Sequence, residues 1–182
     1  LGALSVTWGP SIRHPFDPLI PHCAFLPLKG DALLKFAREN EIAAVFLECI
    51  QGNSGVFPIP EDLAEAVTDL QKERGVLVVA DEIQAGLGRT GKFFAYEHFG
   101  IRPDIIAMGK GIGGGLPLGA AIFCEWSPFA SGEHGSTFAP NPVSLAAGRA
   151  TLSLITPSLL KDVARKGERF RERLALLSWA RG

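Results

Sequence analysis

The sequence predicts an α/β protein with a mostly parallel sheet and crossover helices. Apolar runs at residues 43–47, 76–80 and 104–109 lack the polar alternation of a half-exposed strand, which is typical of strands covered on both faces. Segments with helical periodicity lie between the first two runs and after the last one, which favours crossover connections. With 182 residues, of which 47% are hydrophobic, the chain can bury the core of one domain.

Composition and charge exclude several classes of partner. The formal net charge of −1 gives no basic surface for nucleic acid or for an anionic membrane. No apolar run approaches the roughly 20 residues of a membrane-spanning helix. The cysteines, at 23, 49 and 124, are odd in number and widely spaced, so we expect a reducing compartment and no metal site.

The first part of the chain contains several turn-forming residues. Residues 1–21 are rich in proline and are predicted to form a connection, and the apolar run 23–28 could form an edge strand. Asp31 can cap a helix that continues to about Asn40. Glu48 then closes the strand at 43–47.

Three further helices are predicted. Pro60 precedes a helix that ends near Arg74, and residues 141–155 also have a helical pattern. Residues 158–177 are predicted to form an amphipathic helix whose polar side alternates basic and acidic residues. This alternation favours a solvated face over a nucleic-acid surface.

Polar residues follow two of the apolar strands directly. Asp81 and Glu82 end one strand and Lys110 ends another, and the carboxyl ends of strands in an open α/β sheet meet in one crevice. Burial would lower the pKa of a lysine, as a Schiff-base lysine requires, although a lysine that simply emerges into solvent is the alternative. Asp81 could pair with a protonated pyridine nitrogen, unless Glu82 or a nearby arginine accounts for it structurally.

Two glycine-containing segments resemble nucleotide-binding motifs only superficially. Residues 86–91 match the dinucleotide fingerprint, but that fingerprint requires its first glycine directly after the strand, and residues 81–85 intervene. A nicotinamide enzyme is therefore a minor alternative. The Gly109–Gly111 segment lacks the spacer and the Ser or Thr of a P-loop.

Four segments together carry a family resemblance: 48–52, 81–91, 103–111 and 134–138. Their residues and order resemble the class III pyridoxal-phosphate-dependent aminotransferases, most of all those acting on acetylornithine or ornithine. The resemblance implies the large domain of fold type I and pyridoxal 5'-phosphate as cofactor. It also implies transfer of an amino group from an ornithine-like or ω-amino acid, such as N-acetylornithine, to 2-oxoglutarate by a ping-pong Schiff-base mechanism.

The resemblance implies a role for each residue of the site. Lys110 would attach the cofactor covalently and move protons, and Asp81 would pair with the pyridine nitrogen. Gln84 would hydrogen-bond the phenolic oxygen of the ring. Glu48 would lie near the ring and help to arrange Gln84.

A second group of residues implies a dimer. Thr137, with Ser136 as a weaker candidate, would bind the cofactor phosphate of a neighbouring subunit, so the resemblance implies a homodimer with shared active sites. The other partners would be a small amino donor and a 2-oxo acid acceptor, without nucleic acid or membrane. Asn53 stands where many members carry a glutamate, which leaves the donor open.

The chains of this family are much longer, so we expect a partial chain. Residues 1–155 would be part of the cofactor-binding large domain, and residues 156–182 would be a helix that leads to a small domain. A racemase, aminomutase or decarboxylase on the same scaffold and a non-catalytic fragment are the alternatives. We expect a cytoplasmic location, with the mitochondrial matrix as the alternative.

Overall fold

The computed structural model describes residues 1–53, 55–124 and 129–177 and confirms the α/β architecture. Within these residues a four-stranded sheet has the order β1-β4-β5-β6, formed by Ala44–Leu47, Leu77–Asp81, Ile105–Met108 and Ala120–Phe123. β1, β4 and β5 are parallel, and β6 is antiparallel to β5. The short strands β2 (Ile50–Gln51) and β3 (Phe57–Pro58) form a separate antiparallel hairpin.

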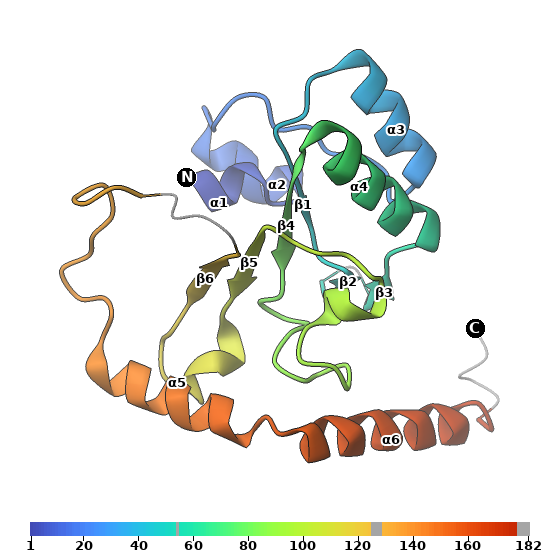
Figure 1. Ribbon diagram of the computed structural model, residues 1–182, viewed down its shortest axis with the longest axis vertical. Helices are drawn as coiled ribbons and strands as arrows, with labels where there is room; N and C mark the ends of the chain where they lie inside the picture. The colour runs from blue at the N-terminus through green and yellow to red at the C-terminus, as the bar shows by residue number, and fades with distance from the viewer. Residues whose placement is uncertain (54, 125–128, 178–182) are drawn as a thin grey trace.

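Helices lie beside the sheet and across its carboxyl end (Figure 1). The α-helices are α1 (Gly2–Ser5), α2 (Pro10–Arg13), α3 (Gly30–Glu39), α4 (Glu61–Arg74), α5 (Pro142–Leu154) and α6 (Pro157–Leu174). The short 3-10 helices are η1 (His14–Phe16), η2 (Ala95–His98) and η3 (Lys110–Gly113). α4 is the crossover helix between β1 and β4, and it ends at Gly75 in the left-handed conformation that favours glycine.

The main core lies between the sheet and the packed pair α3 and α4. Leu33 of α3, Val67 of α4 and Val78 of β4 are almost fully buried in it. Removing such a side chain from water stabilises a fold by about 1.5–3 kcal/mol. Residues 78–80 of β4 are all buried, as its uninterrupted apolar run predicts. Phe46 of β1 is 55% exposed, so the expectation that both faces are covered is wrong for β1.

The amino-terminal part of the chain differs from the expected pattern in two respects. Residues 23–28 are not an edge strand: they pair with no strand among the described residues, and Leu26 and Leu28 pack against the core instead. The proline-rich connection also contains the short turns α1, α2 and η1.

The start of α3 also corrects a prediction. Asp31 lies in the first turn and does not cap the helix. The carboxylate of Asp62, from α4, accepts a hydrogen bond of 2.7 Å from the N–H of Gly30 instead. A tertiary contact thus replaces the local cap, which a sequence pattern alone does not show.

Gly30→Ala is expected to destabilise the fold because a Cβ at Gly30 would lie 2.3 Å from the backbone oxygen of Asp62. Overpacking of this kind costs about 1–3 kcal/mol, more than the helix propensity that alanine gains. Urea unfolding would measure the change. Gly167→Ala is the matched control: Gly167 lies in α6, where an added Cβ would meet no neighbouring heavy atom within 4 Å, so that variant should gain stability. Equal stability of both variants would contradict this account of α3 packing.

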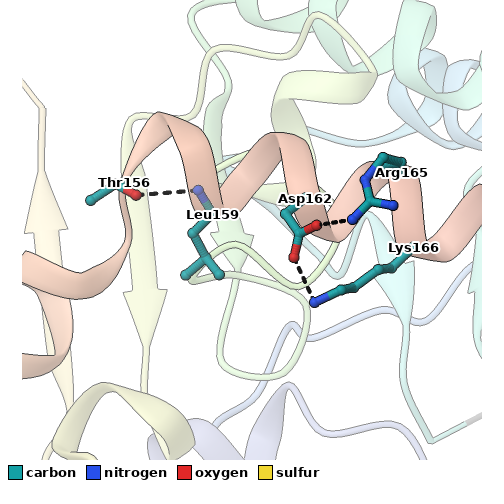
Figure 2. Close-up of polar contacts among 5 residues, drawn as sticks. All are labelled: Thr156, Leu159, Asp162, Arg165 and Lys166. Carbon is teal, nitrogen blue, oxygen red and sulfur yellow. Dashed lines mark hydrogen bonds and ion pairs between the residues drawn. The ribbon is translucent and has the colours of Figure 1, made fainter.

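Helix α6 confirms the predicted amphipathic helix with a charged, solvated side. The Thr156 hydroxyl caps it by accepting the Leu159 N–H at 3.2 Å, and Asp162 pairs with Arg165 and Lys166 (Figure 2). These ion pairs are exposed, so they contribute little to stability. No single helix among the described residues is long and apolar enough to span a membrane, although α5 and α6, bent by 69°, pass that length and composition test as a pair.

Candidate active site

The carboxyl ends of β1, β4 and β5 bring together residues that are far apart in the sequence. Leu47 pairs with Ala80, so Glu48 and Asp81 follow at the same level of neighbouring strands. Asp81 in turn pairs with Ala107 of β5, the strand that leads to Lys110. The structure therefore confirms that the acidic residue and the lysine reach one edge of the sheet.

A line of contacts connects three of the predicted site residues. The Nζ of Lys110 donates a hydrogen bond to the Oε1 of Gln84. A Cβ at Gly52 would lie 2.2 Å from the Nε2 of Gln84, so the Gly52 backbone lies directly against this amide. Gly52 donates its N–H to Glu48 at 3.1 Å, and Glu48 thereby reaches Gln84 through the Gly52 backbone.

Lys110 has two properties that the sequence does not show. Its side chain is exposed, so the expected burial of this lysine is wrong for the structure described here, and the alternative of a lysine that emerges into solvent holds. Its backbone is left-handed, with φ of 47°, at the start of the short helix η3. A non-glycine residue in this conformation stores strain of about 1–3 kcal/mol, a feature that clusters at functional sites.

Asp81 is the last residue of β4. It is half-buried, and its Oδ1 accepts the N–H of Ile83 at 3.0 Å. The ion pairs of the described residues do not include Asp81, so an arginine does not account for this carboxylate. Glu82 does not account for it either, because its side chain bonds to other groups.

The sequence did not indicate separate roles for Glu82 and Asp104. Glu82 is 1% exposed, and its carboxylate accepts the N–H groups of Ala95 and Tyr96, each at 2.9 Å. Burial raises the pKa of this carboxyl above its usual range, against the lowering effect of the two hydrogen bonds. Asp104 accepts the Val78 N–H at 2.7 Å and an amide hydrogen of Gln71 at 2.9 Å, which fixes β4 beside the start of β5.

Ser136 and Thr137 lie outside this cluster. They are exposed in residues 129–141, which run apart from the rest of the described chain at the left of the view (Figure 1). Among the described residues, no hydrogen bond connects either side chain to Lys110, Asp81 or Gln84. Their assignment to a phosphate of a neighbouring subunit stays a prediction.

The cysteines are expected to differ sharply in reactivity. Burial, with the nearby Glu82 carboxylate, raises the pKa of the Cys49 thiol to about 12, whereas Cys23 and Cys124 are exposed. Because the thiolate is the reactive form, a thiol titration of the native chain at pH 8 should detect Cys23 and Cys124 but not Cys49. All three thiols should react after denaturation. A rapid reaction of Cys49 in the native chain would contradict the burial of its thiol.

Comparison with known proteins gives the chain its family. The family model described as "Aminotransferase class-III" matches residues 1–180. The chain is 46% identical over 180 residues to an acetylornithine aminotransferase of Corynebacterium efficiens, covering 96% of this chain and 44% of the relative. It is 42% identical to a [LysW]-aminoadipate semialdehyde/glutamate semialdehyde transaminase of Sulfurisphaera tokodaii, covering 94% and 45%.

Solved structures agree with the sequence relatives. The ornithine aminotransferase of Toxoplasma gondii superposes with a TM-score of 0.78 at 30% identity, over 95% of this chain and 42% of that one. A transaminase of the marine bacterium Virgibacillus superposes with a TM-score of 0.85 at 26% identity, over 96% and 44%. The expected aminotransferase fold is therefore confirmed, although the chain spans less than half the length of these relatives. By sequence and by fold, the chain belongs to the class-III aminotransferases.

Proposed function

We propose that the chain is part of an aminotransferase that depends on pyridoxal 5'-phosphate. Its reaction would move an amino group from an ornithine-like or ω-amino acid donor, such as N-acetylornithine, to 2-oxoglutarate. The observation that carries the proposal is the Lys110–Gln84 hydrogen bond, in a chain of this family whose Lys110 follows the strand paired with Asp81. Relatives named for acetylornithine and for aminoadipate semialdehyde support the class of donor.

The residues present fit the cofactor in their chemistry. Lys110 offers an exposed primary amine that can bond to an aldehyde, and Asp81 offers a carboxylate without a cationic partner among the described residues. Gln84 offers an amide that can bond a phenolic oxygen. When bound, pyridoxal phosphate supplies an electron sink for the carbon from which the substrate loses a proton.

Each residue then has a defined task. Lys110 would hold the cofactor through its Nζ, and the same amine would carry the proton that leaves and re-enters the substrate. Asp81 would hold the protonated ring nitrogen by an ion pair. Gln84 orients the Lys110 amine, and Glu48 supports Gln84 through the Gly52 N–H.

The assembly around this site is also part of the proposal. Thr137 and Ser136 would bind the cofactor phosphate of a second subunit, in a homodimer with shared active sites. Residues 1–155 would belong to the cofactor-binding large domain, and residues 156–182 would lead to a small domain. We place the protein in the cytoplasm and its reaction in amino-acid metabolism such as arginine biosynthesis; bacterial and archaeal relatives support this over a mitochondrial location.

Glutamate formation tests this function. The chain would be incubated with pyridoxal phosphate, N-acetylornithine or ornithine, and 2-oxoglutarate, and glutamate would be measured over time. Glutamate that forms only when both donor and 2-oxoglutarate are present supports an aminotransferase. Conversion of the donor without a 2-oxo acid would indicate a racemase, aminomutase or decarboxylase, and a folded chain without turnover would indicate a non-catalytic fragment.

A further inference from the structure

We propose that Glu82 is a positioning residue that fixes the turn carrying Gln84 against Lys110. The idea rests on the proposed function only in treating Gln84 and Lys110 as working groups of the site. The geometry that supports it belongs to the chain itself. Glu82 is the acidic residue next to Asp81, but its side chain is buried and accepts hydrogen bonds from the backbone of η2.

The carboxylate of Glu82 connects the beginning and the end of a loop by hydrogen bonds. One oxygen accepts the N–H of Ala95 and the other accepts the N–H of Tyr96, each at 2.9 Å. The loop between these bonds, residues 83–94, contains Gln84 near its beginning. A buried carboxylate with both oxygens bonded to backbone N–H groups restrains both ends of such a loop.

The backbone of Glu82 ties the same loop to the strand that leads to Lys110. Its N–H donates to the carbonyl oxygen of Ala107 in β5 at 2.9 Å. Its carbonyl oxygen accepts the N–H of Gly86 at 3.1 Å, which forms the turn that carries Gln84. Glu82 is therefore hydrogen-bonded to three segments: strand β5, the turn that carries Gln84, and the short helix η2.

Close packing leaves this turn little freedom. A Cβ at Gly86 would lie 2.7 Å from the backbone oxygen of Glu82 and 3.1 Å from its Oε2. On the other side, Ile83 packs against Gly109, where an added Cβ would lie 3.3 Å from the Ile83 Cγ2. Gly109 directly precedes Lys110, so the turn is held between the Glu82 carboxylate and the segment that places the lysine.

The other two glycines of residues 86–91 let helix α6 pack closely against the part of the loop that is distant from Gln84. Gly88 and Gly91 have φ of 85° and 86°, and an added Cβ would lie 2.9 Å from Leu160 and 2.8 Å from Ala164 of α6. This glycine pattern therefore serves close approach of a helix and not of a dinucleotide. With α6 against its far side, the loop depends on Glu82 to fix the end that carries Gln84.

The test uses the chain without cofactor, so that it is independent of the aminotransferase reaction. Mass spectrometry would follow how fast acetic anhydride acetylates Lys110, relative to the exposed Lys35 of α3, in Gln84→Ala, Glu82→Ala and Glu82→Gln. Gln84 restrains the exposed Lys110 amine by accepting its hydrogen bond, so Gln84→Ala should raise the ratio several-fold. Glu82→Ala should reproduce this rise. Glu82→Gln, which keeps one acceptor oxygen, should give an intermediate ratio.

Glu97→Gln is the matched control. The Glu97 carboxylate also accepts a loop N–H, that of Phe94 at 2.7 Å, but it is exposed and lies at the far end of the loop from Gln84. The Lys110 ratio of this variant should equal that of the unaltered chain. Circular dichroism would verify that each variant is folded, and the comparison depends on Glu82→Gln if Glu82→Ala does not fold.

Two results would overturn the proposal. A folded Glu82 variant with an unchanged ratio, while Gln84→Ala raises it, would show that Glu82 only stabilises the fold. An unchanged ratio in Gln84→Ala would show that Gln84 does not restrain the lysine. A chain that forms no glutamate but shows the expected ratios would refute the proposed function and leave the positioning role of Glu82 supported.

Discussion

Lys110→Ala is expected to lower kcat/KM for glutamate formation by more than about 10³-fold, because the variant loses both the covalent attachment of the cofactor and the group that carries the substrate proton. The loss should appear mainly in kcat. Donor and 2-oxoglutarate would be varied in the same glutamate assay, with unfolding by urea measured alongside. Stability should change little, because the Lys110 side chain is exposed.

Lys92→Ala provides the control for loss of a nearby lysine. Lys92 is also exposed and donates to a single backbone oxygen, that of Glu97 at 2.9 Å, away from the Gln84 amide. Its activity should stay close to that of the unaltered chain. Comparable losses in the two variants would mean that general charge, and not the position of Lys110, supports the reaction.

Asp81→Asn is expected to lower kcat/KM by about 10²-fold or more, since an ion pair to the ring nitrogen is worth about 2–5 kcal/mol when one partner is removed. Folding should be affected much less. The asparagine oxygen can still accept the Ile83 N–H that Asp81 accepts now, and the residue is only half-buried. Kinetics and urea unfolding of the same preparation would separate the two effects.

Asp104→Asn should show the opposite pattern. Asp104 lies at the start of β5, where one of its oxygens accepts both the Val78 N–H and the Gln71 amide. Weakening these bonds should cost about 1–3 kcal/mol of stability. Activity per folded molecule should persist. If Asp81→Asn lost stability and Asp104→Asn lost activity, the assignment of these two carboxylates would be reversed.

Much of the fold and of the site follows from local patterns in the sequence. The apolar runs of β1, β4 and β5 are continuous, so their ends and their polar successors are visible in the sequence. Residues 78–80 of β4 are buried as such a run predicts, whereas Phe46 of β1 is exposed. The shared edge of Glu48, Asp81 and Lys110 follows from that topology. The Gln84 assignment comes from the family resemblance and stays a prediction, to which the structure adds the contact with Lys110.

Other features depend on tertiary contacts that no local pattern contains. The run 23–28 has the composition of a strand but covers the core, and β6 was not predicted because it is a short antiparallel strand after a glycine-rich turn. The exposure of Lys110 depends on which segments surround it. Glu82 has the same charge as its neighbour Asp81, and only the positions of Ala95 and Tyr96 show that it accepts hydrogen bonds from the backbone of η2.

The most direct test of the central claim is an absorbance titration of the chain with pyridoxal phosphate, followed by borohydride reduction and peptide mapping. The account predicts a visible band of lysine-bound cofactor that saturates, a reduced adduct on Lys110, and loss of both in Lys110→Ala. An adduct on another lysine, or a saturating band that persists in Lys110→Ala, would contradict the claim that the ends of β4 and β5 hold the cofactor.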